Sequence, residues 1–217
     1  MKRLIIYDLD GTLVDTGEDI ANAANYMLEE LCGAALPREA IRRFVGQGLH
    51  DLIKRCLNTE DSVRVQRGLE IFEAYYAKHL TDHSTLYPSA LEVLEYFTLR
   101  SKQAVITNKP NPFARELLNA LGVADYFVEI LAGGSDYPRK PDPAAARSVM
   151  ERYGVAPEET LLVGDSLIDL ETGRNAGVFT VIVAQGFAQK DALRAATPDV
   201  LVEDLQEFLG LARRRGW

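Results

Sequence analysis

The feature that most constrains the fold of this 217-residue chain is the alternation of short apolar runs with helical patterns. Runs rich in Val, Ile and Leu are predicted as strands at residues 3–7, 103–107, 127–132, 160–163, 178–183 and 199–202. Helices are predicted between and after them at 89–100, 111–121, 143–153, 167–176 and 204–212. The apolar runs lack a polar face, which is typical of strands covered on both sides. The alternation therefore predicts an α/β fold with a doubly wound parallel sheet.

One long segment interrupts this alternation. From residue 16 to about residue 84, apolar side chains recur at helical spacing and no strand-like run occurs. The first such series is Ile20, Ala24, Met27, Leu28 and Leu31. We therefore expect a core made of residues 1–15 and 85–217, with residues 16–84 inserted after the first strand as an all-helical domain.

Composition and charge limit the partners of this chain. A net charge of −8 provides no basic surface for a nucleic acid, so we expect none as a partner. The sequence has no run of about 18 apolar residues and no early apolar stretch long enough for a signal peptide, so we expect a cytoplasmic protein without membrane contact. Cys32 and Cys56 lie at apolar positions of predicted helices, which favours buried reduced thiols over a disulfide.

Polar side chains gather where the predicted strands end. Each such group alone has an ordinary structural explanation, such as a turn or a helix cap. In a doubly wound sheet, however, the carboxyl ends of the strands meet at one edge, where ligands bind. The groups at these ends are Asp8, Asp10, Gly11 and Thr12 after the first run, Thr107 and Asn108 at the second, Lys140 after the third, and Asp165, Ser166 and Asp169 after the fourth.

The chemistry of these groups favours phosphoryl transfer. Clustered carboxylates repel one another, and Mg²⁺, which prefers oxygen ligands and substrate phosphates, would neutralise them. An Asp carboxylate can attack phosphorus when positive charge, here that of Mg²⁺ and Lys140, covers the phosphoryl oxygens. The hydroxyl of Thr107 and the backbone N–H groups of Leu9, Gly11 and Asn108 are candidates to hold those oxygens.

Asp10 is the candidate proton carrier. It stands two residues beyond Asp8, where it could protonate the leaving oxygen and later accept a proton from the attacking water. The helical insertion could close over the strand ends and exclude water while substrate is bound. Asp15 stands where the chain leaves the core, and we expect a hinge or helix-capping role for it rather than a metal ligand.

These residues together resemble the four motifs of the haloacid dehalogenase superfamily, in its subgroup with a helical cap after the first strand. The motifs read Asp8-x-Asp10-Gly11-Thr12-Leu13-x-Asp15, Thr107-Asn108, Arg139-Lys140-Pro141 and Gly164-Asp165-Ser166-x-x-Asp169. The resemblance covers nearly the whole chain, and it implies a Rossmann-like core and Mg²⁺-dependent phosphoryl transfer.

The resemblance also implies roles for single residues. It makes Asp8 the nucleophile and Asp10 the general acid and base. It places Mg²⁺ between the side chains of Asp8 and Asp165 and the backbone carbonyl of Asp10, with Asp169 and Ser166 supporting these ligands.

Within the superfamily, the chain is most similar to the phosphoglycolate phosphatases. The similarity rests on Asp15-Thr16-x-x-Asp19-Ile20, Asn22, Asn25, Phe44-Val45-Gly46-Gln47-Gly48-Leu49, Leu52-Ile53 and Thr107-Asn108-Lys109-Pro110. It implies hydrolysis of 2-phosphoglycolate to glycolate and phosphate.

Four residues of the insertion are candidates for substrate specificity. Gly46 and Gly48 would let the backbone approach a small ligand closely, although an ordinary turn between helices explains them as well. Gln47 stands between them. Arg43, or Arg42 beside it, could contact a carboxylate of the substrate, with plain solvent exposure as the alternative for either.

Other activities stay open at this point. Phosphatases for pyrophosphate, sugar phosphates or nucleotides, and sugar-phosphate mutases, differ in contacts from the cap that spacing does not reveal. A receiver module for signalling also combines an acidic cluster with Thr and Lys, but its phosphorylated Asp follows the third strand. We expect a small phosphorylated metabolite as the ligand and a monomer or homodimer as the assembly.

Overall fold

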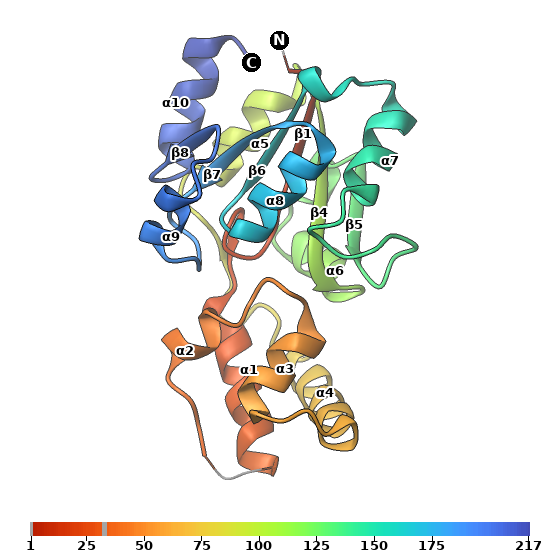
Figure 1. Ribbon diagram of the computed structural model, residues 1–217, viewed down its shortest axis with the longest axis vertical. Helices are drawn as coiled ribbons and strands as arrows, with labels where there is room; N and C mark the ends of the chain where they lie inside the picture. The colour runs from red at the N-terminus through yellow and green to blue at the C-terminus, as the bar shows by residue number, and fades with distance from the viewer. Residues whose placement is uncertain (1, 32–33) are drawn as a thin grey trace.

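A parallel sheet with helices on both faces forms the larger part of the molecule in the computed structural model, which describes residues 2–31 and 34–217 (Figure 1). The strands of the sheet run in the order β5-β4-β1-β6-β7-β8, and all neighbouring pairs are parallel. Their bounds are β1 (Leu4–Tyr7), β4 (Lys102–Pro110), β5 (Glu129–Gly133), β6 (Thr160–Gly164), β7 (Phe179–Val183) and β8 (Val200–Val202). This order confirms the predicted doubly wound, Rossmann-like sheet.

Two predicted strands differ from the observed ones by more than one residue at an end. The strand predicted at 127–132 starts only at Glu129, two residues after the end of a 3₁₀ turn, η1 (Ala124–Tyr126). The second predicted strand continues past residue 107 to Pro110, and its pairing with β5 is irregular between Ile106 and Pro110. The polar residues 107–109 therefore belong to the strand itself.

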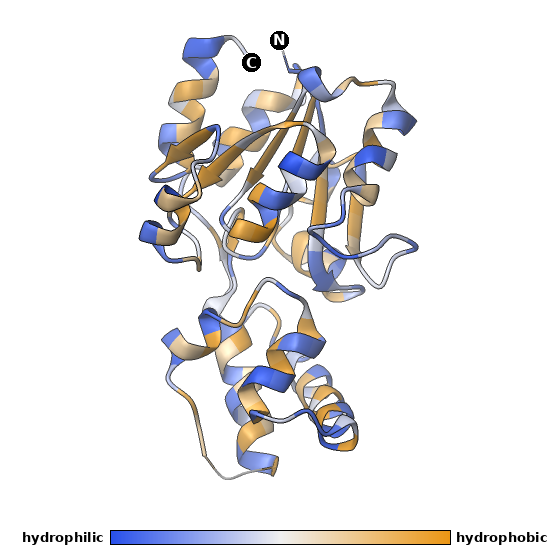
Figure 2. Ribbon diagram, in the orientation of Figure 1, coloured by the Kyte–Doolittle hydropathy of each residue, from blue (hydrophilic) through white to orange (hydrophobic). Residues whose placement is uncertain are grey.

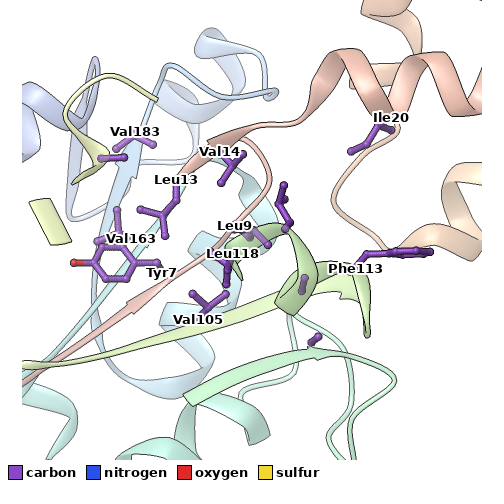
Figure 3. Close-up of a cluster of buried hydrophobic side chains, with 14 of the residues drawn as sticks. Tyr7, Leu9, Leu13, Val14, Ile20, Val105, Phe113, Leu118, Val163 and Val183 are labelled. Carbon is purple, nitrogen blue, oxygen red and sulfur yellow. The ribbon is translucent and has the colours of Figure 1, made fainter. Parts of the chain in front are cut away.

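The two faces of the sheet bury alternate residues of each strand. Leu4, Ile6 and Leu162 pack on the side of α7 and α8, whereas Ile5, Tyr7 and Val163 pack on the side of α5, α6 and α10. Figure 3 shows part of the second cluster around Tyr7, and Figure 2 shows the apolar strands between more polar helix surfaces. The helices are α5 (Ala90–Thr98), α6 (Phe113–Ala120), α7 (Ala144–Tyr153), α8 (Leu167–Ala176) and α10 (Leu205–Arg215). A short helix, α9 (Lys190–Ala195), was not predicted.

The segment between the first two strands of the sheet forms a helical bundle at the carboxyl ends of the strands (Figure 1). Its helices are α1 (Gly17–Leu31), α2 (Arg38–Arg42), α3 (Leu49–Leu57) and α4 (Ser62–Tyr76). Helix α1 packs on α2, α3 and α4, and α3 packs on α4. The bundle buries Cys56, whose thiol pKa burial raises to about 12, while Cys32 lies outside the described residues.

Two short strands connect the bundle with the sheet. β2 (Val14–Asp15) pairs antiparallel with β3 (Thr85–Leu86), a ribbon too short to leave a sequence pattern. Asp15 Oδ1 accepts a hydrogen bond of 3.2 Å from the backbone N of Gly17, the first residue of α1. The buried carboxylate of Asp19 accepts bonds from the backbone N of His83 and from both N and Oγ of Ser84. The outgoing and returning chains are thus tied together.

Within the described chain, every helix falls short of the length and apolarity that crossing a membrane requires.

Candidate active site

A tight turn after β1 places the first two acidic residues of the site. The carbonyl of Leu9 accepts hydrogen bonds from the backbone N of residues 12, 13 and 14, and Gly11 N donates to the carbonyl of Val14 at 2.9 Å. Gly11 adopts a φ of 87°, which an L side chain rarely adopts. The turn holds Asp8 at the end of the strand and Asp10 beside the helical bundle.

Three carboxylates and one ammonium meet at the carboxyl edge of the sheet. Carboxylate oxygens of Asp8, Asp165 and Asp169 all lie within 4.8 Å of one another, and all three residues are buried. The Nζ atom of Lys140 lies 2.7 Å from Asp8 Oδ1 and 2.6 Å from Asp169 Oδ1. The structure thereby brings together the residues that the sequence places after the first, third and fourth core strands.

Electrostatics show that this cluster is short of positive charge. Burial, and then the charge of Asp169, raises the pKa of Asp8 from 3.8 to about 7, although Lys140 opposes the shift. Burial and the charges of Asp169 and Asp8 raise the pKa of Asp165 well above its ordinary value. Burial works against the charge of Lys140, but the carboxylates of Asp169 and Asp8 raise its pKa above the usual range. Buried hard oxygen donors in excess over one ammonium fit a divalent cation such as Mg²⁺.

Neighbouring groups fix two of these carboxylates. Thr12 Oγ1 donates to Asp165 Oδ1 at 3.2 Å, and the backbone N of Phe187 donates to Asp165 Oδ2 at 2.7 Å. Ser166 Oγ donates to Asp169 Oδ2 at 2.6 Å, and Ser166 N does so at 3.1 Å. Each of these carboxylates is thus held by a side-chain and a backbone donor, and Asp169 also by the ammonium of Lys140.

Asp10 belongs to a second network, which reaches into the bundle. Its Oδ1 atom accepts hydrogen bonds from Thr16 Oγ1 at 2.8 Å and from Lys109 Nζ at 3.0 Å. Lys109 Nζ also donates to the hydroxyl of Tyr76, at the end of α4, at 2.7 Å. The sequence pattern predicts no role for Lys109, because the predicted strand ends at residue 107, and it marks Tyr76 only as an apolar position of a helix.

Thr107 and Asn108 lie beside these acids, and Asn108 makes more contacts than the sequence indicates. Thr107 Oγ1 accepts a bond of 3.1 Å from Lys109 N. Asn108 Nδ2 donates to the carbonyls of Gly46 and Lys140, and Asn108 Oδ1 accepts from Lys140 N at 2.9 Å. The side chain of Asn108 therefore joins the loop of Lys140 to the bundle, whereas only its backbone N–H was expected to take part.

A cavity lies between the strand ends and the bundle. It has about 520 Å³ of empty space, which includes the part open to solvent. Its lining consists of Asp8, Asp10, Ile20, Val45, Gly46, Gly48, Leu49, Leu52, Phe72, Tyr76, Thr107, Asn108, Lys109, Pro110 and Phe113. Polar side chains of the strand ends, among them Asp8, Asp10 and Thr107, share this lining with apolar side chains of the bundle and α6.

The candidate specificity residues divide into two groups. Gly46 and Gly48 line the cavity, and both have positive φ. Arg43 and Gln47 are exposed and stand outside its lining. Arg42 lies over the ring of Phe187, 4.7 Å from its centroid, and 3.8 Å from Asp15. Neither arginine is part of the cavity lining.

Comparison with known protein families identifies the family of this chain. Residues 5–183 match the model of the haloacid dehalogenase-like hydrolases. The chain belongs to this family. A phosphoglycolate phosphatase of Vibrio parahaemolyticus is 35% identical over 219 residues, covering 95% of this chain and 94% of that protein. A phosphoglycolate phosphatase of Nitrosospira multiformis is 36% identical over 220 residues, covering 98% and 96%.

The solved structures of haloacid dehalogenase-like hydrolases agree with the fold. A crystal structure described as a predicted phosphoglycolate phosphatase from Haemophilus somnus superposes with a TM-score of 0.91 at 29% identity, covering 97% of this chain and 98% of that one. The family expected from the four motifs is confirmed. The relatives and the acidic site together support phosphatase activity for this hydrolase.

Proposed function

We propose that this hydrolase cleaves small phosphate monoesters through an aspartyl-phosphate on Asp8, that it requires Mg²⁺, and that its substrate is 2-phosphoglycolate. The observation that carries the phosphatase mechanism is the contact of Lys140 Nζ with Asp8 Oδ1 at 2.7 Å, next to a second carboxylate, Asp10, that lines the same cavity. The names of the relatives support the choice of substrate.

The carboxylates fit a magnesium ion. The side chains of Asp8 and Asp165 and the backbone carbonyl of Asp10 would hold it, while Asp169 and Ser166 keep the surrounding groups in place. When bound, Mg²⁺ supplies positive charge that offsets the repulsion between the phosphate dianion and the attacking carboxylate.

The chain's own residues carry out the two steps. An oxygen of Asp8 forms a bond to phosphorus while the bond from phosphorus to the ester oxygen breaks, and Asp10 gives that oxygen a proton. Lys140, the hydroxyl of Thr107, and the N–H groups of Leu9, Gly11 and Asn108 hold the phosphoryl oxygens. Water then attacks phosphorus, gives a proton to Asp10, and releases phosphate from Asp8.

Residues 16–84 act in this proposal as a cap domain over a core of residues 1–15 and 85–217. The hydrogen bond of 2.8 Å from Asn108 Nδ2 to the carbonyl of Gly46 supports this, since it joins the cap to the phosphate-binding end of the cavity. Closure of the cap would exclude water from the ester before cleavage. Gly46 and Gly48 would contact substrate through their backbone.

A panel of phosphate compounds tests the proposal. It contains 2-phosphoglycolate, pyrophosphate, sugar phosphates and nucleotides, each ranked by kcat/KM with Mg²⁺ and with a chelator. We expect 2-phosphoglycolate at the top and no turnover in the chelator. If another compound ranks higher, the proposed substrate is wrong but the proposed reaction stands. Full activity without divalent metal would refute the mechanism.

A further inference from the structure

The cavity has an uneven distribution of charge. Beyond Asp8 and Asp10, its lining is dominated by apolar side chains of the bundle and α6, among them Ile20, Leu52 and Phe113. Of the described residues that line it, Lys109 is the one with a cationic side chain. The cation lies on the side of Asp10, because its Nζ atom is 3.0 Å from Asp10 Oδ1.

The surroundings of Lys109 keep its ammonium charged inside the protein. The residue is 7% exposed, and burial opposes its charge, but Asp10 and Tyr76 raise the pKa of its ammonium above the usual range. An ammonium has three donors, and two of them go to Asp10 Oδ1 and to the Tyr76 hydroxyl. The Tyr76 hydroxyl is neutral at physiological pH, as an ordinary tyrosine is, and burial raises its pKa further, to about 12. One donor and part of the positive charge are therefore available to a ligand.

We infer that Lys109 binds a carboxylate of the leaving group and thereby selects esters in which that carboxylate stands one carbon away from the ester oxygen. The inference rests on the proposed function, in which Asp10 contacts the ester oxygen. In 2-phosphoglycolate a single CH₂ separates that oxygen from the carboxylate. The Lys109 ammonium is a hydrogen-bond length from Asp10 Oδ1, so the two groups match the two ends of this short leaving group.

The rest of the cavity supports the same selection. Hydroxyl groups of a sugar would face apolar side chains such as Leu49 and Phe72, and a buried hydroxyl without a partner is unfavourable. Arg42 and Arg43 of the bundle lie outside the cavity lining, because Arg43 is exposed and Arg42 lies over Phe187. A charge-assisted hydrogen bond in a buried apolar pocket is a strong source of discrimination.

The first test compares 2-phosphoglycolate with isobutyl phosphate, in which two methyl groups replace the two carboxylate oxygens. Both esters need the same proton from Asp10, so the ratio of their kcat/KM values reports recognition of the carboxylate. For the wild type we expect a large preference for 2-phosphoglycolate. For Lys109→Met we expect that preference to fall by about 10- to 100-fold, and for the exposed control Lys78→Met no change.

The outcomes separate the two proposals. A wild type that prefers isobutyl phosphate contradicts the proposed substrate. A wild type that prefers 2-phosphoglycolate, together with an active Lys109→Met variant that keeps the whole preference, overturns the role of Lys109 alone.

A second test covers the case in which Lys109→Met does not fold. The double variant Asp10→Asn with Lys109→Met removes both partners of the buried ion pair, so that neither charge is left unpaired. Binding of both esters is measured by calorimetry with Mg²⁺ and compared with binding to Asp10→Asn alone. We expect Asp10→Asn to bind 2-phosphoglycolate at least about tenfold more tightly than isobutyl phosphate, and the double variant to lose this difference. The same difference in both variants overturns the inference.

Discussion

The ammonium of Lys140 lies 2.7 Å from the carboxylate of Asp8, and both side chains are buried. Asp169 shares that ammonium at 2.6 Å, while Asp165 takes its contacts from Thr12 and from the backbone of Phe187. The three clustered carboxylates therefore exceed the positive charge that Lys140 provides. A dication would supply the missing positive charge and could also bind an oxygen of a substrate phosphate, which links the electrostatics of the site to its proposed chemistry.

Replacement of Asp8 by Asn is the most direct test of the nucleophile. Asp8→Asn should abolish hydrolysis of p-nitrophenyl phosphate, because an amide cannot form the aspartyl-phosphate. The fold should remain at least as stable as in the wild type, because the change removes one of several crowded carboxylates. Turnover and the unfolding temperature are measured on the same preparation. Residual turnover well above background, in protein free of wild type, would contradict the assignment.

Replacement of Lys140 by Met should affect both activity and stability. The variant leaves Asp8 and Asp169 buried without their shared ammonium, and breaking a buried ion pair in this way costs about 3–5 kcal/mol. We expect a lower midpoint in urea unfolding and a severe loss of kcat. Lys190→Met is the matched control, because Lys190 pairs with Glu203 on the surface and should change neither quantity noticeably. Equal effects of the two substitutions would show that the buried pair has no special role.

The pH dependence of stability without Mg²⁺ should report Asp8. Burial raises its pKa from 3.8 to about 7, so the folded state holds the proton more tightly than the unfolded state does. This contribution to stability is complete below about pH 4 and is lost as the pH rises through about 7. In a chelator, the unfolding temperature of Asp8→Asn should therefore match the wild type near pH 4 and exceed it above pH 7. A difference that stays constant across this range would contradict the shift.

Much of the site can be predicted from sequence because parallel strands bring their carboxyl ends to one edge. Asp8, Thr107, Lys140 and Asp165 each follow or end a recognisable apolar run, so their meeting follows from the topology. The strand start predicted at residue 127 lies two residues too early, because the apolar Phe127 and Val128 stand between the 3₁₀ turn and the strand and their composition resembles that of the strand.

The contacts of the helical bundle at the cavity could not be predicted in the same way. The contact between Lys109 and Tyr76 joins a strand to the end of α4, and it depends on how the bundle docks on the sheet. Helical periodicity marks Tyr76 as buried but does not say what its hydroxyl meets. For the same reason the pattern does not distinguish Arg43, which is exposed, from Gly46, which reaches Asn108.

Gly11 leaves room for the carboxylate of Asp165, because it has no side chain. A Cβ atom at this position would lie 2.5 Å from Asp165 Oδ2, and the residue has a φ of 87°. Gly122 has a similar φ of 71°, but a Cβ there would meet nothing within 4 Å. Alanine at either position should destabilise the fold by about 1–2 kcal/mol through backbone strain.

Only Gly11→Ala should also displace the Asp165 carboxylate. We expect it to lower the apparent affinity for Mg²⁺ by about 10- to 100-fold and to lower kcat/KM accordingly, while Gly122→Ala keeps both. The measurement is kcat/KM over a range of Mg²⁺ concentrations, with urea unfolding of both variants as the control for strain. If the two variants lose stability equally and also respond to Mg²⁺ alike, the close approach of Gly11 to Asp165 has no part in metal binding.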